Sequence, residues 1–200
     1  MSTTDNTILG LKLPSDPRWV NLAAISLEDI LSDHAYCEQK AASNCISLIQ
    51  KYPEYTRLVD ELSPIVTEEW GHFRMVLSEM KKRNLTLGPQ RKDEYVNALK
   101  QHEQKGGSPE GRFLDRLLVF GLIEARSCER FRLLSEGLED AYLREFYRKF
   151  MISEAGHYRL FLDLAKEYFP EYKVMTRWKE LLQIEKNILA DMEIRGDRMH

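Results

Sequence analysis

Two short stretches of the chain repeat a combination of side chains that can bind metal ions. Residues 68–77 read EEWGHFRMVL and residues 153–162 read SEAGHYRLFL. Each contains Glu-x-x-His, first at Glu69 and His72 and again at Glu154 and His157. On a helix this spacing places the carboxylate and the imidazole on one face, about one turn apart, so both can reach the same metal centre.

One further glutamate stands on the helical segment before each pair, Glu38 before the first and Glu124 before the second. A chain with this many glutamates and histidines contains about 0.5 Glu-x-x-His pairs by chance, so one pair alone would mean little. Two pairs in matching flanks, each preceded by a glutamate, indicate a duplicated helical hairpin. Outside the repeated phrase, the two halves share little identity.

The four glutamates lie in the middle of apolar stripes at helical spacing, where a side chain faces the interior of a bundle. A lone buried carboxylate is costly and tends to take up a proton. Two divalent metal ions would balance four carboxylates, and two neutral imidazoles would complete the coordination. The pattern therefore predicts a dimetal centre. Its oxygen and imidazole ligands suit iron or manganese, and the spacing does not exclude zinc.

Helical periodicity dominates the elements that must position these residues. We expect long helices over residues 26–51, 63–83, 108–137 and 138–169, with a short helical piece between the first two. A short helix over 93–104 and a last amphipathic helix over 173–194 complete the prediction. Ser26, Ser63 and Ser108 are the expected N-caps, with Pro64 and Pro109 at the first helical position. The prediction is a single domain, residues 1–200, with four long helices in two pairs and a crossover between the pairs.

The composition excludes several classes of protein. Hydrophobic residues make up 43% and charged residues 30% of the 200 residues, which is typical of a globular chain. No apolar run approaches the ~20 residues of a membrane span, and no basic and apolar leader opens the sequence. Three cysteines without a CxxC favour a reducing compartment, so we expect a cytoplasmic protein. The net charge of −3 gives no global sign of nucleic-acid binding.

Three phrases together are more specific than the metal motif. The stretches LSDHAYCEQKAASNCISLI, EEWGHFRMV and SEAGHYRLFL resemble the MiaE family of bacterial tRNA hydroxylases, over about residues 16–195. The resemblance implies an all-α, ferritin-like four-helix bundle with a short crossover helix and a C-terminal helix. It also implies a non-haem di-iron monooxygenase that uses O2 and two electrons. The substrate would be the isopentenyl group of 2-methylthio-isopentenyl-adenosine in tRNA. The ligands carried over by position are Glu38, Glu69, His72, Glu124, Glu154 and His157.

A basic segment offers modest support for a tRNA partner. The stretch KKRNLTLGPQRK has five basic residues and no acid, at the end of a helix that carries two expected ligands. It could contact phosphates, or it could be a solvated helix end that the helix dipole favours. The candidate contacts are Lys81, Lys82, Arg83, Arg91 and Lys92.

Other functions remain open at this point. A ferritin-type ferroxidase or iron-binding protein, a peroxide-handling enzyme, and a metal-free helical interaction protein would all fit a helical bundle. The absence of CxxC pairs argues against the rubredoxin-like domain of rubrerythrins. We expect a monomer or small oligomer that needs an electron donor, which the sequence does not identify.

Overall fold

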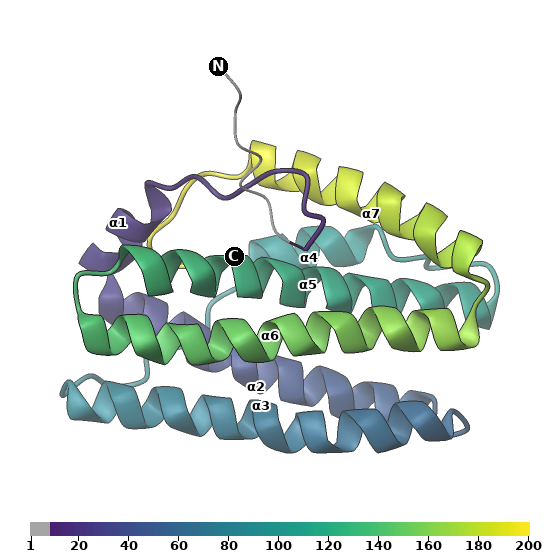
Figure 1. The fold of residues 1–200 in the computed structure, drawn as a ribbon, viewed down its shortest axis with the longest axis horizontal. Helices are drawn as coiled ribbons and strands as arrows, with labels where there is room; N and C mark the ends of the chain where they lie inside the picture. The colour runs from purple at the N-terminus through teal and green to yellow at the C-terminus, as the bar shows by residue number, and fades with distance from the viewer. Residues whose placement is uncertain (1–8) are drawn as a thin grey trace. The chain divides into compact units, whose positions relative to one another are not determined.

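A computed structural model describes residues 9–200. The sequence expectation that no basic and apolar leader opens the chain concerns mostly residues outside that range. Seven α-helices and no strand lie within the described residues (Figure 1). They are α1 (Trp19–Ile25), α2 (Leu27–Lys51), α3 (Thr56–Lys82), α4 (Glu94–Gln101), α5 (Pro109–Gly137), α6 (Ala141–Tyr168) and α7 (Glu171–Asp191). None of these helices is long and apolar enough to cross a membrane.

The chain forms two compact units, and each contains one of the two expected hairpins. The α2–α3 unit comprises residues 18–92 and 195–199. The α5–α6 unit comprises residues 93–194, His200 and the described part of the segment before residue 18. The prediction that residues 1–200 form one domain therefore stays a prediction.

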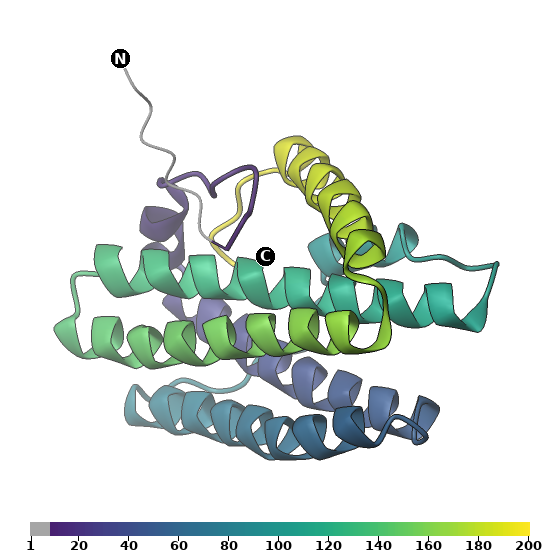
Figure 2. The ribbon, with the colours of Figure 1, turned by 45° about the vertical axis from the view of Figure 1, so that its right-hand side comes forward.

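Within the α2–α3 unit, the two long helices lie side by side along their length (Figures 1 and 2). The short α1, which sequence reasoning missed, packs against α2 and buries Trp19, Val20 and Ala23. The bounds of α2 agree with the predicted helix. Ser26 stands at its N-cap position, but its side chain makes no capping hydrogen bond there.

The predicted start of the second long helix is wrong. Helix α3 begins at Thr56 and continues through Pro64, which sequence reasoning placed at the first helical position. The apolar stripe starts earlier than the proline, because Leu58 and Leu62 are fully buried. Their packing outweighs the backbone hydrogen bond that a proline inside a helix removes. The Ser63 hydroxyl donates to the Val59 carbonyl, at 2.7 Å, instead of capping a new helix.

Within the α5–α6 unit, α5 and α6 form the second hairpin, and α4 and α7 pack on α5. Ser108 caps α5 as predicted, since its hydroxyl accepts the Gly111 N–H at 3.0 Å. Asp140 caps α6 by accepting the N–H groups of Tyr142 and Leu143. The predicted fourth helix is thus three residues shorter at its start, and residues 138–140 form the turn between α5 and α6.

A buried ionic network ties the elements of the α5–α6 unit together. The Arg126 side chain is fully buried, and its Nε donates to Glu185 of α7 at 2.9 Å. Its guanidinium also donates to Glu129 and to the Ser15 hydroxyl in the segment before α1. Tyr95 of α4 donates to the same Glu185 carboxylate at 3.3 Å. Glu129 forms this ion pair and is 1% exposed.

Candidate metal centre

In the α2–α3 unit, Glu38 of α2 meets Glu69 and His72 of α3. All three side chains are buried. His72 Nδ1 lies 3.4 Å from Glu38 Oε2 and 3.4 Å from Glu69 Oε2. One potential ligand atom from each of the three lies within 4.8 Å of those of the other two. Two carboxylates and one imidazole from neighbouring helices therefore converge on one point.

The electrostatics of this cluster favour a cation. Burial and the neighbouring Glu69 carboxylate raise the pKa of Glu38 well above its ordinary value. Burial alone would lower the pKa of His72, but hydrogen bonds and charge from Glu38 and Glu69 raise it to about 10. The two carboxylates therefore favour positive charge beside them, which either a proton on His72 or a metal ion can supply. A divalent ion would supply more positive charge than that proton, so the donor set suits one.

His34 supports this cluster from the preceding turn of α2. Its side chain is fully buried, and its Nε2 lies 2.7 Å from Glu38 Oε1. The neighbouring Asp33 accepts the backbone N–H of Met199 at 2.8 Å, which attaches the C-terminal segment to the same turn. His34 is therefore placed to orient one predicted ligand, as outer hydrogen-bond partners do in metal sites.

The α5–α6 unit contains a matching cluster. Glu124 of α5 and Glu154 and His157 of α6 are all buried. His157 Nδ1 lies 3.2 Å from Glu154 Oε2, and one potential ligand atom from each of the three lies within 4.8 Å of the others. Each unit thus brings together the three expected ligands that it contains. That all six hold one metal pair remains a prediction.

Gly71 and Gly156 stand directly before the two histidines of these clusters. A glycine inside a helix costs about 1 kcal/mol relative to alanine, so a packing or access reason is expected. A Cβ atom built on either glycine would meet nothing within 4 Å. Close packing therefore does not explain these two glycines.

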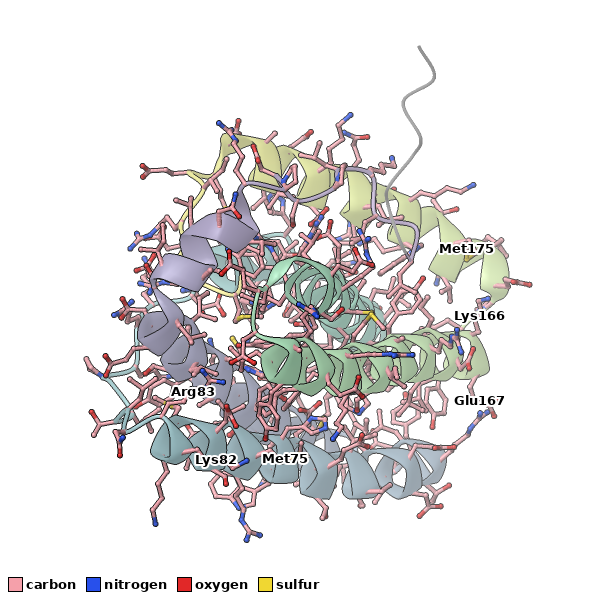
Figure 3. All side chains as sticks on the ribbon, turned by 60° about the vertical axis from the view of Figure 1, so that its left-hand side comes forward. Met75, Lys82, Arg83, Lys166, Glu167 and Met175 are labelled. Carbon is pink, nitrogen blue, oxygen red and sulfur yellow. The ribbon has the colours of Figure 1, made fainter. Side chains whose placement is uncertain are left out.

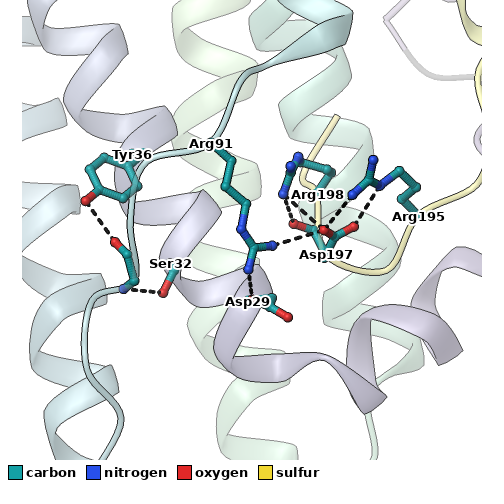
Figure 4. Close-up of polar contacts among 8 residues, drawn as sticks. Asp29, Ser32, Tyr36, Arg91, Arg195, Asp197 and Arg198 are labelled. Atoms are coloured by element: carbon teal, nitrogen blue, oxygen red, sulfur yellow. Dashed lines mark hydrogen bonds and ion pairs between the residues drawn. The ribbon is translucent and has the colours of Figure 1, made fainter.

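Most of the predicted basic tRNA contacts are engaged by carboxylates. Glu79, which is 2% exposed, receives a hydrogen bond from Arg83 Nε at 2.7 Å and lies 3.5 Å from Lys82 Nζ. Arg91 pairs with Asp29, and its Nη1 lies 3.0 Å from Asp197 Oδ2 (Figure 4). These pairs anchor the end of α3, the segment after it and the C-terminal segment.

The segment before α4 is also held by neutral contacts. The Gly88 N–H donates to the Ser32 hydroxyl at 3.1 Å, and the Tyr36 hydroxyl donates to the Gly88 carbonyl at 2.9 Å (Figure 4). Ser32 and Tyr36 flank His34 on α2, two residues before it and two residues after it. The basic segment therefore has a structural role in the α2–α3 unit, whether or not it also contacts phosphates.

Comparisons with known proteins agree with the family resemblance of the sequence. A family model described as tRNA-(MS[2]IO[6]A)-hydroxylase (MiaE) matches residues 3–200. A Pseudomonas putida protein named tRNA 2-(methylsulfanyl)-N(6)-isopentenyladenosine(37) hydroxylase is 36% identical over 188 residues, or 92% of this chain and 85% of the relative. A Salmonella typhimurium protein with the same name is 26% identical over 241 residues, with 94% of this chain and 85% of the relative covered.

A solved structure supports the fold class. Protein 43 with aldehyde deformylating oxygenase activity, from Synechococcus, has a TM-score of 0.90 and 37% identity to this chain, and 96% of each chain is covered. The helical content and this similarity confirm the prediction of an all-α, ferritin-like fold. Together with the match over residues 3–200, they place this chain in the MiaE family of tRNA hydroxylases.

Proposed function

We propose that this chain is a tRNA-modifying hydroxylase that acts on the isopentenyl group of 2-methylthio-isopentenyl-adenosine. The observation that carries the proposal is the pair of matching Glu, Glu, His clusters in a chain of the MiaE family. Both named relatives are hydroxylases of this nucleoside in tRNA. We further propose that the two units build one domain, with one dimetal centre between six ligands, and that the protein works in the cytoplasm.

The six proposed ligands would hold two iron ions, with one Glu from each of α2 and α5 and a Glu-x-x-His from each of α3 and α6. When bound, such a pair supplies the oxidation of an unactivated C–H bond with O2 and two electrons from a donor protein or small reductant. The chain supplies the ligand cage and a dry surrounding. Phe73 is 8% exposed beside His72, and Phe120 and Phe161 pack edge to face in the other unit, 5.8 Å apart. These rings exclude water from the neighbourhood of both clusters.

The test is nucleoside mass spectrometry on isopentenyl-modified tRNA after incubation with iron-loaded protein, a reductant and O2. The expected result is a gain of one oxygen on the isopentenyl-adenosine, which is absent when O2 is omitted. The matched variant Glu124→Ala should lose the activity and part of the iron while its far-UV circular dichroism stays helical. Consumption of O2 without any gain of oxygen on the nucleoside would overturn the proposal and favour iron oxidation or peroxide handling.

A second candidate comes from the solved structure. The Synechococcus protein is as similar to this chain as the Pseudomonas putida hydroxylase is, at 37% against 36% identity, and its described activity is deformylation of aldehydes. Incubating the same iron-loaded protein with an aldehyde tests this reading. Loss of the aldehyde with no change in the tRNA would favour it over hydroxylation.

A further inference from the structure

One face of α3 carries exposed side chains that the metal cluster does not use. Trp70, Arg74, Ser78 and Lys81 follow one another at intervals of one helical turn, so they form a single stripe along the helix. All four are exposed, and the Trp70 side chain, at 46%, is among the large exposed hydrophobic residues of the described chain. We refer to these four residues as the Trp70–Lys81 surface.

The charge of this surface is entirely positive. Arg74 and Lys81 are its charged residues, and neither forms an ion pair or side-chain hydrogen bond with any residue in the range 9–200. Their neighbours Lys82 and Arg83 differ, because both lie beside the buried Glu79 carboxylate. The two cations on the stripe are about 10 Å apart along the helix axis, given the rise of an α-helix. They are therefore free to contact an anionic partner with more than one charge.

Trp70 is held in position next to the proposed ligands. It directly follows Glu69, and its ring packs on Phe73 with centroids 4.9 Å apart and planes tilted by 36°. Phe73 in turn follows His72 and is 8% exposed. The indole thus rests on a buried ring and leaves about half of its surface open. Beside it, the open space over Gly71 leaves room for a flat group to approach.

We propose that the Trp70–Lys81 surface binds the anticodon loop of the tRNA substrate. The Trp70 indole stacks on an unpaired base, and Arg74 and Lys81 contact phosphates of the same strand. A single-stranded nucleic acid offers both partners together, an open π-face and a chain of negative charges. This inference rests on the proposed function and adds exposed residues of α3, outside the ligand set, that contact the tRNA.

The second hairpin provides an internal comparison. The residues of α6 equivalent to the Trp70–Lys81 surface are Ala155, Arg159, Asp163 and Lys166. This stripe has no aromatic residue and includes an acid, and Lys166 Nζ lies 3.5 Å from Glu171. Figure 3 labels Lys166 on α6, and Met75 and Lys82 on α3. The duplication therefore supplies control positions of the same residue types on an equivalent helix.

The test compares four variants of the iron-loaded, full-length protein: Trp70→Ala, Trp70→Phe, the double variant Arg74→Gln with Lys81→Gln, and the control double variant Arg159→Gln with Lys166→Gln. Binding of isopentenyl-modified tRNA is measured by filter retention over a range of KCl concentrations. Iron content and circular dichroism are measured in parallel, and all variants should keep the iron and helicity of the parent protein.

Trp70→Ala should weaken binding about tenfold, since one base–aromatic stack is lost, and Trp70→Phe should restore most of the affinity. Removing Arg74 and Lys81 should reduce the slope of log Kd against log salt by about one for each cation. The control variant should bind as the parent protein does.

Three outcomes would overturn the inference. If the parent protein binds and hydroxylates tRNA but Trp70→Ala and the Arg74/Lys81 variant bind equally well, the surface is wrong and the proposed function stands. If the control variant weakens binding as much as the Arg74/Lys81 variant does, any loss of positive charge weakens tRNA binding, and the assigned surface is again wrong. If the parent protein neither binds nor hydroxylates tRNA, both proposals fall.

Discussion

His34 illustrates how a single residue supports the proposed centre without being one of its ligands. It lies one turn before Glu38 on α2, and its Nε2 is 2.7 Å from that carboxylate. Removing it would take away the buried hydrogen bond that holds Glu38 Oε1. We predict that His34→Ala lowers iron affinity by on the order of tenfold, as loss of outer hydrogen-bond partners does in other metal sites. Competition with a chelator would measure this.

The matched control is His102→Ala, because His102 is exposed and lies in the α5–α6 unit just after α4. Its iron affinity should equal that of the parent protein. A His34→Ala protein that keeps its helicity and binds iron as tightly as the parent would mean that Glu38 does not depend on His34.

The sequence was more informative about ligands than about the residues around them. Glu-x-x-His fixes two donors on one helical face wherever the helix packs, so the two Glu-His pairs could be predicted from spacing, and Glu38 and Glu124 from their places on the apolar stripes. His34 could not be assigned in this way, because a histidine at helical spacing can equally point to solvent. The i, i+4 spacing does place His34 and Glu38 on one face of α2, but whether that face is buried at His34 depends on how α2 packs. Glu129 is similar: its burial depends on Arg126 and Ser15 reaching it.

At the scale of the elements, two helix starts with similar sequence signals differ in the structure. Asp140 accepts two backbone N–H groups at the start of α6, whereas Ser26 makes no capping bond at the start of α2. We predict that Asp140→Ala lowers the free energy of unfolding by about 1 kcal/mol, the usual cost of losing a cap. Ser26→Ala should change it by much less. Urea unfolding of both variants measures the difference, and equal losses would contradict the assignment of the caps.

The Arg126 network should make the α5–α6 unit depend on charge pairing. Arg126→Met would leave Glu185 and Glu129 buried without their guanidinium partner, at a cost of about 3–5 kcal/mol. Burial raises the pKa of Glu185, and Arg126 opposes that shift, so the variant should have a still higher pKa there. A carboxyl group whose pKa is raised in the folded state stabilises the fold at low pH, and this stabilisation is lost as the pH rises through the raised pKa. The loss should therefore be smaller at pH 5 than at pH 8.

Urea unfolding at the two pH values tests this, with Arg148→Met as the control. Arg148 lies 3.9 Å from Glu145, and both side chains are mostly exposed, so little change is expected at either pH. A loss in Arg126→Met that is the same at pH 5 and pH 8 would show that the buried carboxylates do not govern the stability of the variant.

Element boundaries could be predicted where local signals and packing agree. Ser108-Pro109 starts α5 as expected, because a capping hydroxyl and a proline both favour that position. The same signal at Ser63-Pro64 failed, because Leu58 and Leu62 extend the buried stripe of α3 to the other side of the proline. Local residues show where a helix can begin, but the extent of its apolar contacts decides where it does begin.

At the scale of the whole molecule, the chain is a duplicated hairpin, and each copy brings together two carboxylates and one imidazole. The all-α, ferritin-like class could be predicted because helical periodicity and the repeated motif agree. Whether the two clusters form one centre stays a prediction, since it depends on how the hairpins dock. The central claim is that each hairpin supplies half of one dimetal centre, so that neither half binds iron in the same way alone.

Mössbauer spectroscopy of the protein loaded with iron-57 tests that claim most directly, with iron content measured on the same samples. The parent protein should hold about two iron ions per chain as one spin-coupled pair, as in other carboxylate-bridged centres. His72→Ala and His157→Ala change opposite halves, and each alone should abolish the coupled pair. If each variant instead loses one iron and keeps the other unchanged, or if the parent protein's two ions are uncoupled, the halves are independent sites and the claim is wrong.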